Sequence, residues 1–164
     1  MKEIFERRSV RKFAAREVEA EKLEAVLRAG MAAPSAGNQR PWEFYIVRNR
    51  EKLEALSTLS RYAGPVAAAP LAIVTVCNPE GKRFAEVAAT DMAACTENLW
   101  LGAVSVGLGT VWIGVYPYEE RVNVTNQILG IPAGKYVFSI LPLGYPAEEK
   151  TAEDRFDPAR IHEL

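Results

Sequence analysis

The sequence predicts one domain in which helices pack on a β-sheet, of the α/β or α+β class. Three observations support this prediction. Segments with helical spacing of apolar residues alternate with segments of strand character along the chain. The 164 residues correspond to one domain, residues 1–164, and no linker or repeat divides them. The composition, 49% apolar and 25% charged, is that of an ordinary globular protein.

The first half of the chain predicts three helices and two strands. Leu23, Val26 and Leu27 fall at helical spacing, and Pro34 ends that pattern. One strand alternates and carries aromatic residues, whereas the other is wholly apolar and ends at a turn of Asn, Pro and Gly. The helices are expected at residues 2–8, 20–31 and 50–60, and the strands at 42–47 and 71–77.

The second half predicts two helices, two strands and a tail. Gly130 followed by Pro132 closes the second of these helices. The helices are expected at 84–106 and 119–129, and the strands at 110–115 and 136–143. The charged tail at 147–164 is expected to cross a surface of this chain or of a partner.

The helix at 84–106 is apolar on nearly every side and rich in alanine and glycine. Such a helix has to be buried on every side, and a domain of 164 residues can hardly surround it. The sequence therefore predicts a homodimer. Asp91, Glu97 and Asn98 are polar islands within this helix, and Asp91, Cys95 and Asn98 share one stripe.

Composition and charge exclude several classes of protein. A net charge of −1 argues against a nucleic-acid-binding protein. The chain opens without a secretion signal and has no apolar run long enough for a membrane span, so we expect a cytoplasmic protein without a membrane partner. Cys77 and Cys95 lie in apolar runs, which indicates buried free thiols. His162, the only histidine, supports neither a triad nor a metal site.

Positive charge is concentrated in the segment RRSVRK at residues 7–12. Guanidinium groups, a hydroxyl and backbone amides that converge in this way bind phosphate well. Two other interpretations remain open. The segment could be a solvated basic surface, or a nucleic-acid patch, which is the weaker alternative because the rest of the chain is not basic.

A second polar cluster, APSAGNQRPW at residues 33–42, is longer than a minimal connection between a helix and a strand needs. Proline and glycine fix a turn there, and Ser35, Asn38 and Gln39 offer donors and acceptors close to the backbone. Such a loop can hydrogen-bond the amide edge of a planar heterocycle. An ordinary connecting turn remains the alternative.

No serine, cysteine or carboxylate pair has the spacing of a nucleophile or of an acid–base couple. The GLG at 107–109 precedes a strand rather than a helix and is therefore no dinucleotide fingerprint. Gly114, in the expected strand, allows a close approach to the backbone, and a kink in the core is the alternative. If the protein is an enzyme, we expect a bound cofactor to carry the chemistry.

These segments resemble the nitroreductase family of FMN-dependent oxidoreductases. The resemblance covers essentially the whole chain, and its specificity lies in several motifs that occur in the family's order. These are RRSVRKF at 7–13, APSAGNQRPWEF at 33–44, Asp91 to Asn98 followed by GLGTVWIG at 107–114, LGYP at 143–146, and the late Arg155.

The resemblance implies an α+β, nitroreductase-like fold: a mixed central sheet flanked by helices, in an intertwined homodimer. It implies two FMN sites at the subunit interface. The basic cluster and the tail would hold the phosphate, ribityl chain and pyrimidine edge, the loop would come from the opposite subunit, and the strand would lie along the ring near N5. The implied cofactor-binding residues are Arg7, Arg8, Ser9, Arg11, Pro34, Ser35, Asn38, Gln39, Trp112, Ile113, Gly114 and Arg155.

The activity that the resemblance implies is hydride transfer from NAD(P)H, through flavin N5, to nitroaromatic, quinone or similar acceptors in a ping-pong cycle. No catalytic side chain is implied; Arg11 is the candidate for the positive group that stabilises the reduced flavin. Three alternatives stay open. They are another flavin reaction on the same fold (enoate reduction, reductive dehalogenation or consumption of reduced flavin), a flavin-binding protein without turnover, and a basic binding module without flavin. The native acceptor, the choice between NADH and NADPH, and the role of Glu97 are not encoded in any motif.

Overall fold

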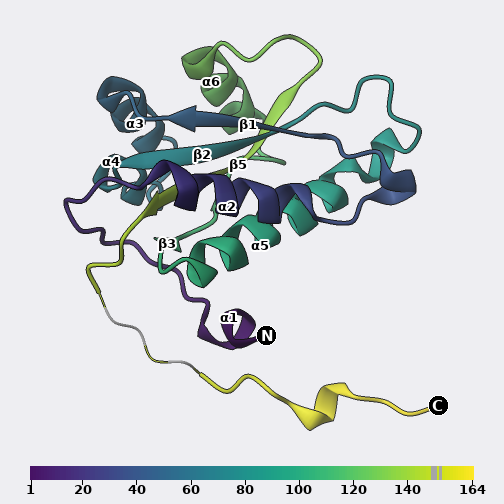
Figure 1. Ribbon diagram of the computed structural model, residues 1–164. Helices are drawn as coiled ribbons and strands as arrows, with labels where there is room; N and C mark the ends of the chain where they lie inside the picture. The colour runs from purple at the N-terminus through teal and green to yellow at the C-terminus, as the bar shows by residue number, and fades with distance from the viewer. Residues whose placement is uncertain (149–150, 152) are drawn as a thin grey trace.

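The computed structural model describes residues 1–148, 151 and 153–164, and it has three layers, a β-sheet between two groups of helices (Figure 1). The strand order is β1-β2-β5-β3, and β4 also pairs with β5. The strands are β1 (Trp42–Val47), β2 (Leu71–Cys77), β3 (Gly109–Thr110), β4 (Ile113–Gly114) and β5 (Tyr136–Gly144). Helices beside an antiparallel sheet make this an α+β fold, as expected.

All pairs between the named strands are antiparallel. The resemblance implies a mixed sheet. Within the described ranges, the parallel part is confined to an isolated bridge between Ser9 and Thr110. That bridge nevertheless matters, because it attaches the basic cluster to the edge of the sheet.

Strand β2 is buried along its whole length because both faces of the sheet are covered. Leu71 and Ile73 pack into the layer of α2 (Ala20–Met31) and α5 (Ala88–Ser105). Ala72 and Val74 belong to the opposite cluster, which contains side chains of the remaining helices of the sandwich. Those helices are α3 (Arg50–Ser57), α4 (Pro65–Ala68) and α6 (Glu119–Leu129). Two apolar faces explain why this strand shows no alternation in sequence.

Glycines allow α2 and α5 to approach each other closely. A Cβ atom added at Gly102 would lie 2.7 Å from the Cβ of Ala29, and one added at Gly30 would lie 2.6 Å from Cδ2 of Leu99. Both glycines are buried. The small residues of the expected helix 84–106 therefore serve packing inside one chain, in addition to any role at a partner surface.

The expected helix at 84–106 is wrong at its start, since α5 begins at Ala88. A 3₁₀ turn, η2 (Ala85–Val87), precedes it. The reason lies in Phe84: its backbone N–H donates to Oε1 of Gln39 and its carbonyl accepts from Nε2 of Gln39, both at 3.0 Å. The backbone at this position is therefore held by the loop before β1 rather than by the helix.

The expected strand at 110–115 is interrupted. Thr110 pairs with Leu143 and Ile113 pairs with Ile140, and the same register puts Val111 opposite Pro142. Proline has no N–H to donate to a neighbouring strand. The pairing with β5 therefore breaks into β3 and β4, and the chain between them is free to turn Trp112 toward Phe138, whose ring centroid lies 5.7 Å away.

Other boundaries differ by a few residues. The expected helices 2–8 and 50–60 end earlier, at Glu6 in α1 (Lys2–Glu6) and at Ser57 in α3. The short helix α4, which begins with Pro65, was not expected from the sequence. The expected elements at 20–31, 42–47, 71–77 and 119–129 are confirmed with the same bounds, and β5 is one residue longer than expected.

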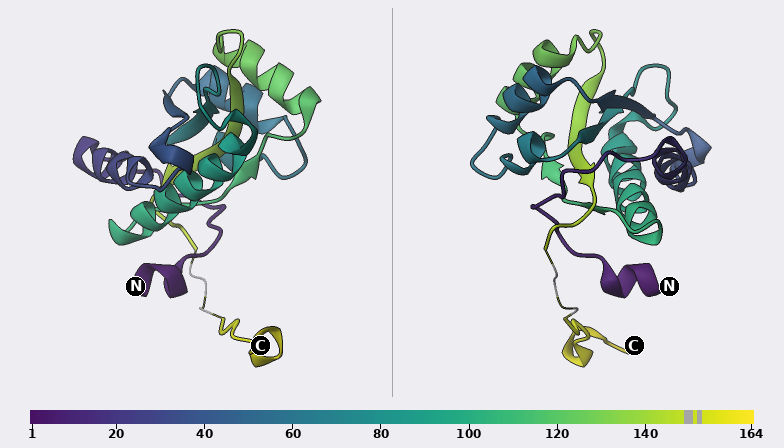
Figure 2. Two further views of the ribbon diagram at one scale, coloured as in Figure 1. Left: turned by 90° about the vertical axis from the view of Figure 1, so that its right-hand side faces the viewer. Right: turned by 60° about the vertical axis from the view of Figure 1, so that its left-hand side comes forward.

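Both ends of the chain extend away from the layered body (Figures 1 and 2). Helix α1 has no buried residue, and residues 153–164, which include η3 (Pro158–Arg160), are exposed. Part of the expected tail, residues 149, 150 and 152, lies outside the described residues. Large apolar side chains are exposed on both extensions, among them Ile4, Phe5 and Phe156.

Two expectations from composition can be compared with this fold. Cys77 and Cys95 are buried free thiols, as expected, and burial raises the pKa of the Cys95 thiol to about 12. Among the helices of the described ranges, none has the length and hydropathy needed to cross a membrane.

An exposed polar cluster attaches the segment before α2 to the end of β5. The Tyr145 hydroxyl donates to Oε2 of Glu19 at 2.7 Å, and the Arg16 guanidinium donates to Oε1 at 2.7 Å. The Arg16 guanidinium also lies over the Tyr145 ring, 3.9 Å from its centroid. The hydrogen bond from Tyr145 is the largest cause that lowers the pKa of Glu19 from 4.5 to about 2, and the hydrogen bond from Arg16 lowers it further.

This pKa shift predicts how the effect of Tyr145→Phe depends on pH. Because the folded-state pKa of Glu19 is lowered, its contribution to stability is complete above pH 4.5 and is lost as the pH falls toward 2. We expect urea unfolding to show Tyr145→Phe less stable than the wild type at pH 6, with the difference shrinking between pH 4.5 and 2. A difference of equal size at every pH would show that Tyr145 acts by packing alone.

Candidate functional site

The basic cluster at residues 7–12 lies beside β3. Val10 donates its backbone N–H to the Thr110 carbonyl at 3.0 Å, and Ser9 bridges to Thr110. A Cβ atom at Gly109 would lie 2.7 Å from Cγ2 of Val10, so only glycine permits this approach. The structure thus brings two motifs that are distant in sequence, RRSVRKF and GLGTVWIG, side by side.

Arg8 is the most constrained side chain of the cluster. Its Nη1 donates to the carbonyls of Phe5 and Arg7, at 3.0 and 2.6 Å, and its Nε donates to the Thr151 carbonyl at 2.9 Å. Its Nη2 is buried and has no hydrogen-bond partner in the described part of the chain. A buried guanidinium nitrogen without an acceptor is costly unless an anion completes it.

Arg7 lies on the face of α5. Its Nε is 3.5 Å from Oε1 of Glu97, and its guanidinium carbon lies 4.2 Å from the centroid of the Trp100 ring. The Glu97 side chain is 45% exposed, so this ion pair contributes little to stability. In this chain, then, Glu97 pairs with Arg7, which answers the question that the sequence left open.

Arg11 lines a pocket of about 310 Å³ together with Trp112, Ile113 and Gly114. We call this the inner pocket; Val111, Ser60, Tyr62 and Arg121 complete its lining. Four residues that the sequence assigned to one cofactor therefore share one cavity. They come from the segment before α2 and from the region around β4, which β5 holds in place.

The inner pocket and its surroundings fit a flavin phosphate and ring in three respects. Arg8 Nη2 and Thr110 Oγ1 are buried donors without a partner among the described residues, and a phosphate would supply acceptors for them. No atom lies within 4 Å of a Cβ built on Gly114, so a planar ring has room to approach that backbone. Arg11 places a positive charge on the rim of the same pocket.

Asp91 organises the second polar cluster, the loop at residues 33–42. Its carboxylate is buried and accepts from the Ala36 backbone N–H at 2.9 Å and from Nε2 of Gln39 at 2.7 Å. Ser35 adds an internal bond, because its Oγ accepts from the Arg40 N–H at 2.9 Å. The loop is therefore a built structure and not a loose connection.

Gln39 uses its amide to hold this loop. Both N–H groups and the carbonyl are engaged, by Asp91 and by the backbone of Phe84. The sequence assigned Gln39 to the cofactor, whereas in this structure its side chain supports the loop that carries Ser35 and Asn38. Gln39 would act on a cofactor only by positioning those neighbours.

The same loop contains unusual backbone conformations. Asn38 has a φ of 55° and Arg40 a φ of 46°, which residues with a side chain adopt rarely. Gly37 also has a positive φ, and a Cβ there would lie 2.7 Å from the Phe84 ring. Non-glycine residues at positive φ cluster at ligand sites, which marks this loop as a candidate binding element.

The two halves of the expected site do not meet within one chain. Among the described residues that line the inner pocket, none belongs to the loop residues assigned from the sequence, which are Pro34, Ser35, Asn38 and Gln39. Arg155, expected near the phosphate, instead lies on the exposed tail, with its Nη2 3.6 Å from Glu153. Figure 1 shows this tail leaving the body of the molecule. Within one chain, the assigned loop residues and the inner pocket therefore remain separate.

Five residues of the site were not assigned to the cofactor from the sequence: Ser60, Tyr62, Asp91, Val111 and Arg121. Asp91 was noted as a polar island in an apolar helix and as part of a motif of the resemblance, without an assigned role. Ser60 and Tyr62 follow α3 in a turn, and Arg121 lies in the first turn of α6; nothing in their sequence context separates them from ordinary surface residues. No cluster of metal-binding side chains occurs in the parts of the chain that the structure describes.

Comparison with known families gives a match along most of the chain. The family model described as the nitroreductase family matches residues 4–80 and 67–145. These ranges include the basic cluster, the loop before β1 and the strands that line the inner pocket.

Individual relatives agree with this family match. A candidate NADH dehydrogenase/NAD(P)H nitroreductase of Archaeoglobus fulgidus is 43% identical over 166 residues, covering 99% of this chain and 95% of its own length. The crystal structure of a candidate NADH oxidase from Clostridium acetobutylicum is 43% identical, with a TM-score of 0.94 over 98% of this chain and 97% of that chain. The structure of an FMN-dependent nitroreductase from Clostridium difficile is 32% identical, with a TM-score of 0.91 over 99% and 98% of the two chains.

Proposed function

The chain belongs to the nitroreductase family of oxidoreductases, and from that premise we propose that it is an FMN-dependent NAD(P)H oxidoreductase. The observation that carries the proposal is the inner pocket, which Arg11 lines together with Trp112 and the strand β4. Arg8, on the same segment as Arg11, has a buried Nη2 without an acceptor among the described residues. A relative named as FMN-dependent and relatives named for NAD(P)H point to the same cofactor and reductant.

In this proposal the flavin, when bound, supplies the chemistry by accepting a hydride from NAD(P)H at N5 and passing it to a nitroaromatic, quinone or similar acceptor that binds afterwards. The protein's own groups bind and orient. Arg8 would hold the phosphate with its free Nη2, Ser9 and Arg7 would lie along the ribityl chain, and Arg11 would stabilise negative charge at the pyrimidine edge.

Gly114 and its neighbours would border the ring. The open space beside Gly114 leaves room for a flat ring against the backbone, while Trp112, fixed against Phe138, closes one side of the pocket. No side chain has to move a proton at a defined atom in this arrangement, so binding and electrostatics are what the chain contributes.

We further propose that the site is completed by a second copy of the chain. Helix α5 buries only half of its residues within one chain and leaves Leu101 and Val104 half-buried, and α1 exposes Ile4 and Phe5. Apolar surface of this kind favours association. A partner would bring Pro34, Ser35 and Asn38 to the inner pocket, and an exchanged tail would bring Arg155 to the phosphate.

The proposal is tested with the purified holoprotein under anaerobic conditions. We expect a yellow protein with an FMN spectrum that NADH or NADPH bleaches and that a nitroaromatic or quinone recolours. Bleaching without recolouring by any acceptor would indicate a flavin-binding protein without turnover. A protein that remains colourless after incubation with FMN would refute the proposal.

A further inference from the structure

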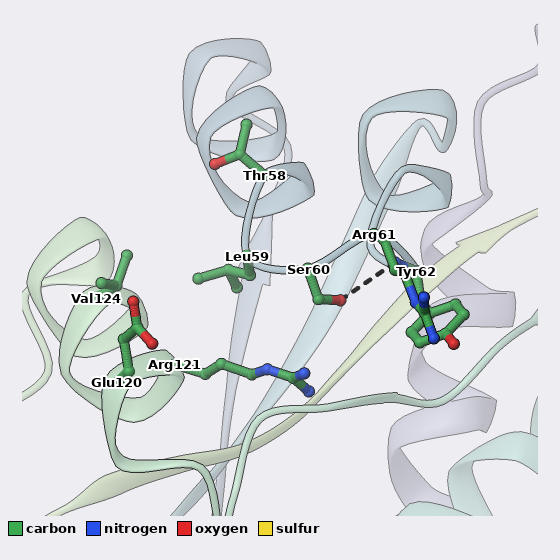
Figure 3. A pocket seen from close by; sticks show the side chains of 8 residues that line it. All are labelled: Thr58, Leu59, Ser60, Arg61, Tyr62, Glu120, Arg121 and Val124. Carbon is green, nitrogen blue, oxygen red and sulfur yellow. Dashed lines mark hydrogen bonds between the residues drawn. The ribbon is translucent and has the colours of Figure 1, made fainter.

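A second hollow adjoins the inner pocket on the side of α6, and no role in the proposed chemistry requires it (Figure 3). This outer groove has a volume of about 560 Å³ and is lined by residues 58–62 of the turn after α3 and by Glu120, Arg121 and Val124 of α6. Its size lies in the range of pockets that hold small ligands, roughly 300–1,000 Å³.

The outer groove and the inner pocket share three lining residues, Ser60, Tyr62 and Arg121. The two hollows are therefore adjacent. A ligand whose reactive end lies in the inner pocket can extend its remainder into the outer groove. Of the reactants in the proposed cycle, a pyridine dinucleotide has such a long remainder.

The charge of the outer groove favours an anion. Arg61 and Arg121 contribute two guanidinium groups against the single carboxylate of Glu120. Neither arginine forms an ion pair with a carboxylate of the described residues. Instead the Arg61 guanidinium lies 4.7 Å from the centroid of the Tyr62 ring, and the Arg121 guanidinium lies 4.1 Å from that of the Tyr118 ring. Arg11 on the inner pocket adds a third positive charge.

Arg121 is fixed at the junction of the two hollows. Its Nη1 donates to the Gly114 carbonyl at 3.1 Å, which ties the guanidinium to the strand that borders the proposed ring site. Figure 3 shows its side chain reaching from α6 toward the turn that carries Ser60. A guanidinium held at one nitrogen keeps other N–H donors for a ligand, and its planar fork suits phosphate oxygens.

We propose that the outer groove binds the diphosphate of the reduced pyridine nucleotide, with Arg121 as its principal ligand and Arg61 as a second. This inference rests on the proposed function and adds to it the part of the donor that the chain recognises. In NAD(P)H the diphosphate is joined to the nicotinamide riboside, so a nicotinamide stacked on a flavin at the inner pocket would place the diphosphate at or just beyond the junction. An anionic acceptor is the competing occupant, and the experiment separates the two.

The test compares holoprotein variants Arg121→Gln and Arg61→Gln with the control Arg48→Gln, which removes an exposed charge paired with Glu17 away from the groove. The donors are NADH and the uncharged dihydronicotinamide riboside, with a neutral quinone as acceptor. We expect Arg121→Gln to raise the KM for NADH about tenfold, the loss expected for one charge-assisted hydrogen bond. The rise for Arg61→Gln is expected to be about threefold because Arg61 is solvent-exposed.

We expect the riboside kinetics to stay unchanged in Arg61→Gln and Arg48→Gln, and Arg48→Gln to match the wild type with NADH as well. Because Arg121 also holds the Gly114 carbonyl, the expected result for Arg121→Gln is a larger rise in KM for NADH than for the riboside. Calorimetric titration with ADP-ribose, which carries the diphosphate but no nicotinamide, should show the same loss of affinity in Arg121→Gln. Arg121→Gln removes the hydrogen bond to the Gly114 carbonyl. No hydrogen bond joins the Arg61 side chain to the described residues, so a raised KM for NADH in Arg61→Gln supports the proposal independently.

Three results would overturn the inference. The first is an unchanged KM for NADH in both variants. The second is an equal rise in the KM values for NADH and for the riboside. The third is a rise only in the KM for a carboxylated nitroaromatic acceptor used in place of the quinone. If neither donor reduces the wild-type flavin, the proposed function fails, and ADP-ribose binding then decides the inference by itself.

Discussion

Replacing Arg8 with glutamine is expected to weaken FMN binding about a hundredfold. Arg8 is held by the carbonyls of Phe5, Arg7 and Thr151, and its buried Nη2 is left for a ligand. Loss of a charge-assisted hydrogen bond of this kind costs about 2–3 kcal/mol, which corresponds to roughly a hundredfold in the dissociation constant. Fluorescence titration of the apoprotein with FMN measures the effect directly.

Two controls make this result specific for the phosphate. Arg28→Gln removes an arginine of the exposed face of α2, where it pairs with Glu24, and should leave FMN affinity unchanged. Riboflavin lacks the phosphate, so its affinity should be the same in the wild type and in Arg8→Gln. If the variant loses riboflavin and FMN equally, Arg8 supports the fold and does not bind phosphate.

Replacing Asp91 with alanine is expected to lower the free energy of unfolding by about 3–5 kcal/mol and to abolish tight FMN binding. The buried carboxylate holds the Ala36 N–H and the Gln39 amide, and both donors would lose their acceptor inside the protein. Each buried donor left without a partner costs about 1–3 kcal/mol, and loss of a charged acceptor costs more. Chemical denaturation followed by FMN titration measures the two effects.

The matched control is Glu86→Ala, which removes an exposed carboxylate from η2, just before α5. Its free energy of unfolding should stay within about 0.5 kcal/mol of the wild type. Asp91→Asn keeps one acceptor oxygen and should fall between the two. A loss below about 1 kcal/mol in Asp91→Ala would contradict the role of Asp91 in holding the loop.

The elements that the sequence predicted well are those whose burial is decided by one chain. The apolar run of β2 and the amphipathic spacing of α2 led to correct bounds because the sheet and its helices bury those residues directly. The errors arose where a contact distant in sequence overrides the local pattern. Pro142 interrupts the strand opposite it, and the Gln39 side chain takes the backbone of Phe84 out of helix α5.

In the candidate site, too, residues in local motifs were found from the sequence, whereas residues that depend on contacts distant in sequence were not. Arg11, Trp112, Ile113 and Gly114 were assigned from their motifs, and the structure brings them into one pocket. Ser60, Tyr62 and Arg121 could not be found in that way, because a turn residue and a helix arginine become site residues only through the packing of α3 and α6. Gln39 is the opposite case: its motif assigned it to the cofactor, but its side chain donates to the Phe84 carbonyl and to Asp91 and so supports the loop.

The central claim is that two copies of the chain bring together the assigned loop residues and the inner pocket, which remain separate in one chain, and native mass spectrometry of the purified protein tests it most directly. We predict a species of two chains with two FMN molecules, and loss of both flavins whenever the dimer is dissociated. A single chain that retains one tightly bound FMN would contradict the shared site, and a single chain that takes up no FMN at any concentration would contradict the account as a whole.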